Sequence, residues 1–184
     1  EENVWKLCEH IQLSDNPSQL QHCYAVFISN DKQAVPIWKQ KASTNPEVPV
    51  LWDYHVIFIY EDEAVTLVYD LDSELPFPCS FDTYVNEALP QDDLLKPEFQ
   101  RYFRVVRADV FIANFASDRK HMVKENTDWM MPPPPYPCIR TTDSSNNLQE
   151  FISMKTSSAT RGEVMTWTAF VSRFHDPERR WSLR

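Results

Sequence analysis

The chain has 184 residues, a net charge of −9, 42% hydrophobic residues and 13% aromatic residues. The acidic balance argues against a nucleic-acid partner, which needs a basic face, and the apolar content argues against a disordered chain. No apolar run approaches the ~20 residues of a membrane span, so we expect one catalytic domain over residues 1–184 and no membrane partner.

Glycine and cysteine restrict the chemistry further. The chain has one glycine, Gly162, so it can build neither a Gly-x-Gly-x-x-Gly turn nor a Walker phosphate loop. Its four cysteines, Cys8, Cys23, Cys79 and Cys138, lack the Cys-x-x-Cys spacing of zinc and redox sites. We therefore expect no cofactor and no metal. We also expect free thiols in the reducing cytoplasm, with the nucleus as a second location.

Two kinds of periodicity follow each other along the chain. Apolar residues at helical spacing predict a helix within the first residues, which a turn at residues 14–17 ends. Runs rich in β-branched and aromatic residues predict strands over residues 24–29, 35–39, 51–60, 65–71 and 104–107. Further helices are predicted over residues 81–89, 97–103, 110–115, 148–152 and 167–174. Ser80, Asp109 and Thr166 are the predicted caps of three of them. This order predicts an α+β fold with a mainly antiparallel sheet flanked by helices.

A histidine and an aspartate stand out in the two central strands. The short acidic break between residues 51–60 and 65–71 predicts an antiparallel hairpin. If Tyr60 lies opposite Val65, the two residue numbers of every opposed pair in the hairpin add up to 125. The numbers of His55 and Asp70 also add up to 125, so these residues are expected directly across from each other. A histidine held by an aspartate is the orienting half of a nucleophile–His–Asp triad. The alternative is a structural His–Asp pair on a sheet face.

None of the four cysteines is an evident nucleophile for such a triad. Cys8 lies on the apolar face of the first helix, and the other three lie beside a turn or prolines without an activating feature. A reactive thiol is favoured at a helix N-terminus, where the helix dipole lowers its pKa. In this chain that position falls at or just before Glu1.

A proline-rich segment, Pro132 to Pro137, must be extended because consecutive prolines fix φ and remove donors. It contains a Pro-Pro-x-Tyr match, Pro133 to Tyr136, of the kind that WW-type domains bind. Since core-like residues follow it, we favour a rigid strap across the domain surface over a partner-binding segment.

The stretch Trp52-Asp53-Tyr54-His55-Val56 resembles the signature of the protein N-terminal glutamine amidohydrolases, also called the WDYHV family. The likeness continues in order along nearly the whole chain. It covers residues 1–9, 23–30, 36–40, 69–72, 75–78, 115–119 and 132–138. The resemblance implies an α-β-α sandwich related to the papain-like and transglutaminase-like thiol hydrolases.

The resemblance also implies an activity and a triad. The activity is hydrolysis of the side-chain amide of an N-terminal glutamine to glutamate with release of ammonia, in the N-degron pathway of protein degradation. The family's Cys-His-Asp triad matches His55 and Asp70. Its cysteine comes directly before the Glu-Glu-Asn that here is Glu1-Glu2-Asn3, and the sequence begins one residue after it. The expected protein is a monomer acting on proteins or peptides with N-terminal Gln.

Two residues close to His55 in the sequence are candidates for substrate binding, and two other functions remain open. Asp53, expected on the same strand face as His55, is a candidate acceptor for the substrate's α-ammonium, and Trp52 is a second candidate substrate-binding residue. The alternative for Asp53 is to satisfy backbone or arginine donors. Another thiol acyl-transfer activity on the same scaffold remains open. So does a catalytically inactive interaction module that works through the Pro-Pro-x-Tyr segment.

Overall fold

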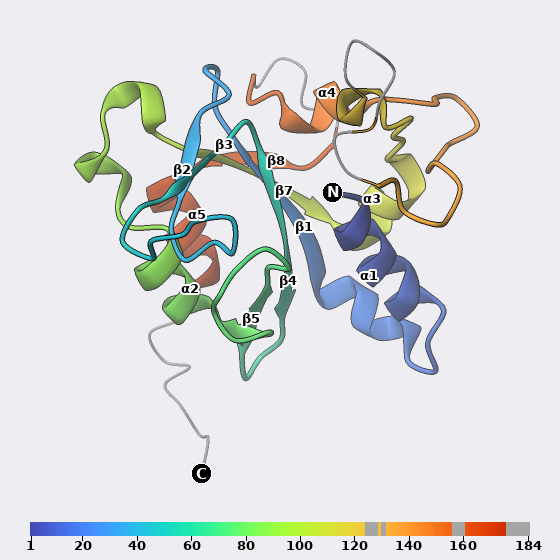
Figure 1. Cartoon of the computed structure of the whole chain (residues 1–184). Helices are drawn as coiled ribbons and strands as arrows, with labels where there is room; N and C mark the ends of the chain where they lie inside the picture. The colour runs from blue at the N-terminus through green and yellow to red at the C-terminus, as the bar shows by residue number, and fades with distance from the viewer. Residues whose placement is uncertain (124–128, 130–131, 156–160, 176–184) are drawn as a thin grey trace.

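The computed structural model describes residues 1–123, 129, 132–155 and 161–175. It is built around a six-stranded sheet in the order β6-β5-β4-β1-β7-β8, in which every pair is antiparallel (Figure 1). These strands are β1 (Cys23–Ser29), β4 (His55–Glu61), β5 (Thr66–Tyr69), β6 (Cys79–Ser80), β7 (Tyr102–Arg107) and β8 (Glu163–Thr166). A second sheet pairs β2 (Val35–Ile37) with β3 (Val50–Trp52).

Helices pack on both faces of the large sheet (Figure 1). One face packs against α1 (Glu2–Gln12), α3 (Ala108–Asn114) and α4 (Leu148–Ile152), and the other against α2 (Phe81–Ala88) and α5 (Trp167–Phe174). Within the described residues, the 3-10 turns that connect the elements are η1 (Pro17–His22), η2 (Asp92–Leu94), η3 (Pro97–Phe99) and η4 (Lys120–Met122). None of the described helices is long and apolar enough to cross a membrane.

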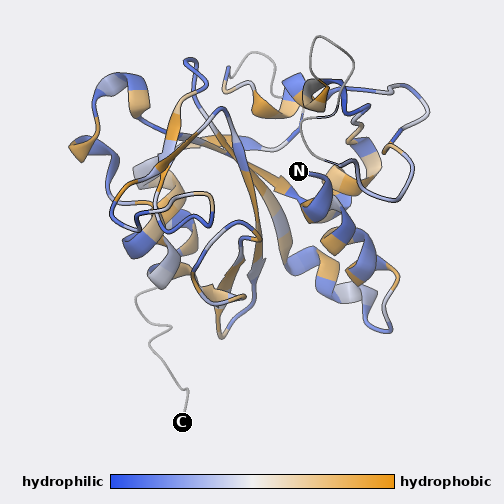
Figure 2. Cartoon of the chain, in the orientation of Figure 1, coloured by the Kyte–Doolittle hydropathy of each residue, from blue (hydrophilic) through white to orange (hydrophobic). Residues whose placement is uncertain are grey.

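The two faces have separate apolar cores because consecutive residues of a strand point to opposite sides. In β1, Phe27 belongs to the cluster under α1, α3 and α4, whereas Ile28 belongs to the cluster under α2 and α5. Figure 2 shows hydrophobic residues along the strands of the sheet and a mixture of hydrophobic and hydrophilic residues along the helices. The predicted α+β class with a mainly antiparallel sheet is confirmed, and helices flank both of its faces.

Most predicted helices are present. The first helix spans Glu2–Gln12, and α4 has the predicted bounds. Ser80 and Thr166 cap α2 and α5: their hydroxyl oxygens accept from the backbone N–H of Thr83 at 3.2 Å and of Ala169 at 3.4 Å. These hydroxyls satisfy N–H groups that the first turn of a helix leaves without a carbonyl.

Two local predictions are wrong. Residues 97–103 are not a helix: only Pro97–Phe99 forms a 3-10 turn, and β7 begins at Tyr102 because it pairs with both β1 and β8. Asp109 is not a cap either. Helix α3 begins at Ala108, and the Asp109 carboxylate instead accepts from the Arg107 guanidinium at 2.7 Å.

The predicted strand over residues 51–60 is two strands in two sheets. β3 ends at Trp52 and pairs with β2, whereas β4 begins at His55 and pairs with β1 and β5. Asp53 and Tyr54 form the break, where the Asp53 carboxylate accepts from the backbone N–H of Tyr54 at 2.9 Å. Such a local bond competes with a strand ladder. Asp53 therefore does not share a strand face with His55, contrary to the prediction.

The register of the β4–β5 hairpin also differs from the prediction. Glu61 pairs with Thr66 and Phe58 with Tyr69, so paired numbers total 127 rather than 125. The cause is Asp62, whose carboxylate accepts from the backbone N–H of Ala64 and of Val65 and closes the turn one residue later, so the partner of each strand residue moves by two. A shift of two residues keeps every side chain on its predicted face.

Gly162 lies where other residues would be strained. Its φ is +78°, and a Cβ added there would lie 2.4 Å from the carbonyl oxygen of Val105. Both the backbone conformation and the close approach of β7 require a residue without a side chain. This position leads directly into β8.

Candidate active site

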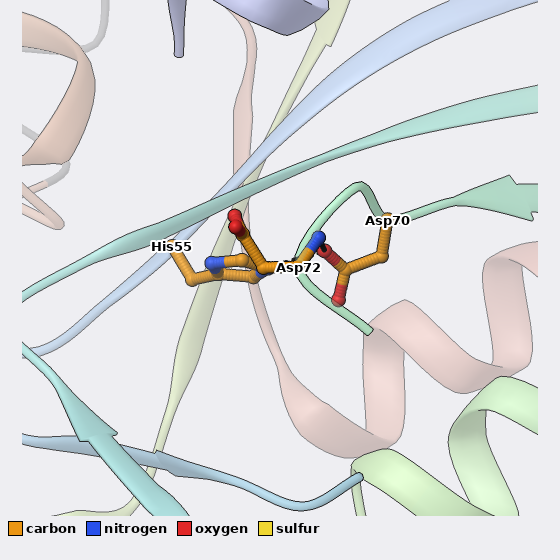
Figure 3. A group of neighbouring side chains, drawn as sticks. All are labelled: His55, Asp70 and Asp72. Atoms are coloured by element: carbon orange, nitrogen blue, oxygen red, sulfur yellow. Dashed lines mark hydrogen bonds and ion pairs between the residues drawn. The ribbon is translucent and has the colours of Figure 1, made fainter. Parts of the chain in front are cut away.

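His55 and Asp70 meet at the end of the β4–β5 hairpin. His55 is the first residue of β4, Asp70 follows the last residue of β5, and the His55 Nε2 and Asp70 Oδ1 atoms lie 2.9 Å apart (Figure 3). Both residues are buried, with 4% and 5% of their surface exposed. The shift in register makes the pair diagonal rather than directly opposed, and diagonal neighbours on one face are within reach of long side chains.

Asp70 receives hydrogen bonds on both carboxylate oxygens. Oδ1 faces His55 and accepts from the backbone N–H of Asp72 at 3.0 Å. Oδ2 accepts from the Gln40 amide at 3.0 Å and from the Tyr84 hydroxyl at 2.7 Å. Burial alone would raise the pKa of Asp70. The hydrogen bond and charge of His55, with the bonds from Gln40 and Tyr84, instead lower it to about 2.

The charge on Asp70 fixes which nitrogen of His55 carries a proton. An ionised carboxylate only accepts, so the hydrogen in the 2.9 Å bond lies on Nε2. The other ring nitrogen, Nδ1, is then left to exchange protons with a reacting group. This is the arrangement that a general acid–base histidine needs.

Trp52 and Asp53 occupy different places around His55. The Trp52 ring stacks on the His55 ring with centroids 5.2 Å apart and an angle of 29°, so it shields one face of the imidazole. Asp53 is exposed, and its carboxylate is turned to the neighbouring backbone. The structure thus brings Trp52 to the His–Asp pair and leaves Asp53 in the strand break.

The beginning of α1 lies beside the same strand. The Tyr54 hydroxyl donates to the Glu1 carboxylate at 2.9 Å, so the residue before His55 contacts the N-cap of α1. A residue directly before Glu1 would stand at the helix N-terminus, where backbone N–H groups and the helix dipole favour a thiolate. The end of the helix and the His55–Asp70 pair are therefore neighbours in space.

A buried ion pair holds this helix end in place. The Arg119 guanidinium donates to the Glu2 carboxylate at 2.7–3.0 Å, and both side chains are at least nine-tenths buried. Arg119 also donates to the carbonyl oxygens of Pro134 and Tyr136, which belong to the proline-rich segment. Glu2, Arg119 and the segment thus form one assembly at the start of α1.

The proline-rich segment lies across the surface as an extended strap. Residues 132–138 form no helix or strand. The Tyr136 ring lies beneath the Lys6 ammonium at 4.8 Å and the Arg119 guanidinium at 4.9 Å. The tyrosine of the Pro-Pro-x-Tyr match is thus engaged within the molecule, which favours the strap over the partner-binding segment.

Three of the four cysteines, Cys8, Cys23 and Cys79, are not activated thiols. Cys8, Cys23 and Cys79 are buried, and burial raises the pKa of all three thiols. The pKa of Cys23 rises to about 12, and that of Cys79 to about 11 with a further contribution from the charge of Asp70. Cys138 is partly buried. The positions of Cys8, Cys23 and Cys79 suit packing rather than nucleophilic attack.

Sequence reasoning missed three groups of the site. Gln40 and Tyr84 reach Asp70 from segments far away in the chain, and no local pattern marks them. Asp72 had a signal, since it follows Asp70 by two residues in Tyr69-Asp70-Leu71-Asp72. Ligand atoms of His55, Asp70 and Asp72 lie within 4.8 Å of one another, which makes them the potential metal ligands among the described residues. The absence of a metal stays a prediction.

Comparisons with known proteins give one consistent result. The model of a family described as N-terminal glutamine amidase matches residues 1–174. The chain is 51% identical over 175 residues to the protein N-terminal glutamine amidohydrolase of Homo sapiens, covering 95% of this chain and 84% of the relative. It is 48% identical to the protein of the same name in Danio rerio and 44% in Drosophila melanogaster. Both matches cover 95% of this chain and 85% of the relative.

Proposed function

The chain belongs to the N-terminal glutamine amidase family, and on this premise we propose that His55 and Asp70 are two members of a Cys-His-Asp triad. The reaction is hydrolysis of the side-chain amide of an N-terminal glutamine, and its products are an N-terminal glutamate and ammonia. The substrates are proteins or peptides that begin with Gln. The observation that carries the proposal is the buried hydrogen bond between His55 and an ionised Asp70.

The third member of the proposed triad is a cysteine directly before Glu1. The support is geometric, because Tyr54, the residue before His55, donates to the Glu1 carboxylate, and because a helix N-terminus lowers the pKa of a thiol. The burial of Cys8, Cys23 and Cys79 supports the same assignment, since none of the three is activated.

The chemistry proceeds by acyl transfer. His55 Nδ1 takes the proton of the thiol, and the thiolate attacks the side-chain carbonyl carbon of the substrate glutamine. The tetrahedral intermediate collapses as His55 returns the proton to the departing nitrogen, which releases ammonia and leaves a thioester. Water activated by His55 then hydrolyses the thioester to glutamate and restores the thiol. Asp70 holds the imidazole in orientation throughout.

The surroundings of the triad complete the proposal. Trp52 covers one face of the imidazole, and this contact supports the proposal that Trp52 lines the substrate site. The first backbone N–H groups of α1 are the proposed oxyanion donors, because the first turn of a helix leaves them without carbonyl partners. We also propose kinship with papain-like and transglutaminase-like thiol hydrolases. Its support is that a helix N-terminus faces an antiparallel sheet carrying the histidine and aspartate.

A role in the N-degron pathway, in the cytoplasm and nucleus, is part of the same proposal. The thiol chemistry needs a compartment in which cysteines stay reduced. The four free cysteines are in keeping with such a compartment.

The decisive experiment compares two proteins that differ only in the residue before Glu1. One carries cysteine there and the other alanine, each preceded by the same short upstream segment. The cysteine protein should convert N-terminal Gln to Glu, seen as a mass gain of about one dalton with ammonia released. The alanine protein should be slower by about 10⁶-fold. Equal activity in both, lost when one of the four internal cysteines is mutated, would show that the nucleophile lies elsewhere.

A further inference from the structure

An enzyme that acts only on N-terminal glutamine must distinguish a free α-ammonium from the peptide bond of an internal residue. In glutamine, four bonds join the α-nitrogen to the side-chain carbonyl carbon, a span of roughly 5 Å. A group that binds the ammonium must therefore lie close to the catalytic pair. This inference rests on the proposed function and asks which residue supplies that group.

Asp72 has the required position and chemistry. Its carboxylate lies within 4.8 Å of the ligand atoms of His55 and Asp70, and Figure 3 shows the three side chains together. His55 and Asp70 are buried, whereas Asp72 is exposed and therefore accessible to a substrate. Within the described ranges, no hydrogen bond or ion pair engages the Asp72 carboxylate.

The backbone of Asp72 is fixed relative to the reacting groups. Its N–H donates to Asp70 Oδ1 at 3.0 Å, and its carbonyl oxygen accepts from the backbone N–H of Lys41 at 2.8 Å. The side chain therefore begins from a defined place beside the catalytic pair. A substitution of its carboxylate leaves both backbone bonds intact.

We propose that Asp72 binds the α-ammonium of the N-terminal glutamine and so makes the enzyme specific for a chain terminus. The carboxylate supplies both a negative charge and hydrogen-bond acceptors, which the three N–H donors of an ammonium match. Asp53, the acceptor expected from the sequence, is less suited. Its carboxylate is bound to the backbone of Tyr54 and does not belong to the group around His55.

The test measures how strongly the enzyme prefers a charged terminus. The substrates are a Gln-initiated tripeptide and its analogue with a hydroxyl in place of the α-amine, which is neutral and nearly isosteric. In the cysteine-bearing protein, Asp72→Asn should reduce the preference for the amine in kcat/KM by about tenfold to a hundredfold, the range of a charged hydrogen bond. The loss should appear as a higher KM for the amine substrate, with kcat nearly unchanged.

Asp53→Asn is the matched control, because it neutralises a neighbouring exposed aspartate and should leave the preference unchanged. A preference that survives Asp72→Asn, or that falls in Asp53→Asn instead, would overturn the proposal. An equal fall in kcat for both substrates would also overturn it, because Asp72 would then serve His55 rather than the ammonium.

Calorimetry measures ligand binding without turnover, so it tests the role of Asp72 independently of the proposed reaction. With serine in place of the cysteine before Glu1, the protein should bind the amine tripeptide more tightly than the hydroxyl analogue, and Asp72→Asn should abolish the difference. If the cysteine protein fails to hydrolyse the peptide, the proposed function falls, yet this difference still supports Asp72. Equal affinities for the two ligands in the serine protein would refute the role of Asp72 directly.

Discussion

Asp70 keeps its negative charge in a buried position because donors face both of its oxygens. A buried carboxylate without such partners becomes protonated, since desolvation raises its pKa. Here the hydrogen bonds outweigh burial and the pKa falls to about 2. The group that orients His55 is therefore an anion throughout the neutral range, which keeps the imidazole in the tautomer that acid–base catalysis needs.

Replacing either member of the pair should abolish catalysis without unfolding the protein. In the cysteine-bearing protein, His55→Ala should remove nearly all turnover. Asp70→Asn should lower kcat by up to about 10⁴-fold, because the amide can donate and so favours the wrong tautomer. Ammonia release from a Gln-initiated peptide measures both, with circular dichroism as the control for folding. Near-normal release by His55→Ala would eliminate the mechanism.

The lowered pKa of Asp70 also predicts an acid-sensitive stability. A carboxyl group whose folded pKa lies below its unfolded value stabilises the protein above the unfolded pKa, and this stability is lost as pH falls through the folded pKa. For Asp70 the window runs from about 3.8 down to about 2 and corresponds to about 2 kcal/mol. Urea unfolding between pH 6 and pH 2 should therefore show a steeper loss in the wild type than in Asp70→Asn. Parallel curves would contradict the assignment.

For single residues of the site, the sequence predicts which side chains share a strand face, but it does not predict contacts with residues far away in the chain. Strand alternation placed His55 and Asp70 on one face even though the register was off by two, because an even shift preserves the face. Gln40 and Tyr84 reach Asp70 only through the fold, from the region after β2 and from α2. Asp53 was misplaced because a local hydrogen bond ends the strand.

The two confirmed helix caps allow a test of α2 and α5. Ser80→Ala and Thr166→Ala should each lower the free energy of unfolding by about 1 kcal/mol, because each removes the oxygen that accepts from the first turn. Urea titration of the single and double variants measures this, and the two effects should add to within about 0.5 kcal/mol. Thr44→Ala, in an exposed loop, is the control. A cost at Thr44 equal to that at Thr166 would contradict the capping role.

Elements with a strong local signal were predictable, and elements defined by pairing were not. The apolar face and the cap of α5 can be read from residues 166–174 alone. Strand β6 has only two residues and β8 has four without a strong apolar pattern, and they pair with β5 and β7. The early start of β7 has the same origin, since Tyr102 pairs on both sides.

The arrangement of the whole sheet follows from long-range pairing that composition does not reveal. β1 and β2 are consecutive in the chain, yet β1 pairs with β4 and β7 whereas β2 pairs with β3 in another sheet. β1 contributes buried residues to the apolar cores on both faces of the sheet. The class of the fold could therefore be predicted, but the order of its strands could not.

Arg119 connects three distant parts of the molecule, namely the start of α1, its own loop and the proline-rich strap. Arg119→Gln should lower the free energy of unfolding by about 3 kcal/mol, because it leaves the buried Glu2 carboxylate without its partner. Turnover by the cysteine-bearing protein should fall by up to about 10²-fold, since Glu2 belongs to the helix end at which we propose the nucleophile. Urea unfolding and ammonia release measure the two effects.

Two further variants test whether the effects of Arg119→Gln come from the broken ion pair with Glu2 or from the removal of any arginine. Arg107→Gln removes an exposed pairing with Asp109 and should leave both measurements unchanged. The double variant Glu2→Gln with Arg119→Gln should recover part of the stability, because no buried charge then lacks a partner. Turnover should stay low in the double variant, since the strap and the helix end are still unanchored. If Arg119→Gln proves as stable as Arg107→Gln, the assembly at the start of α1 does not depend on this ion pair.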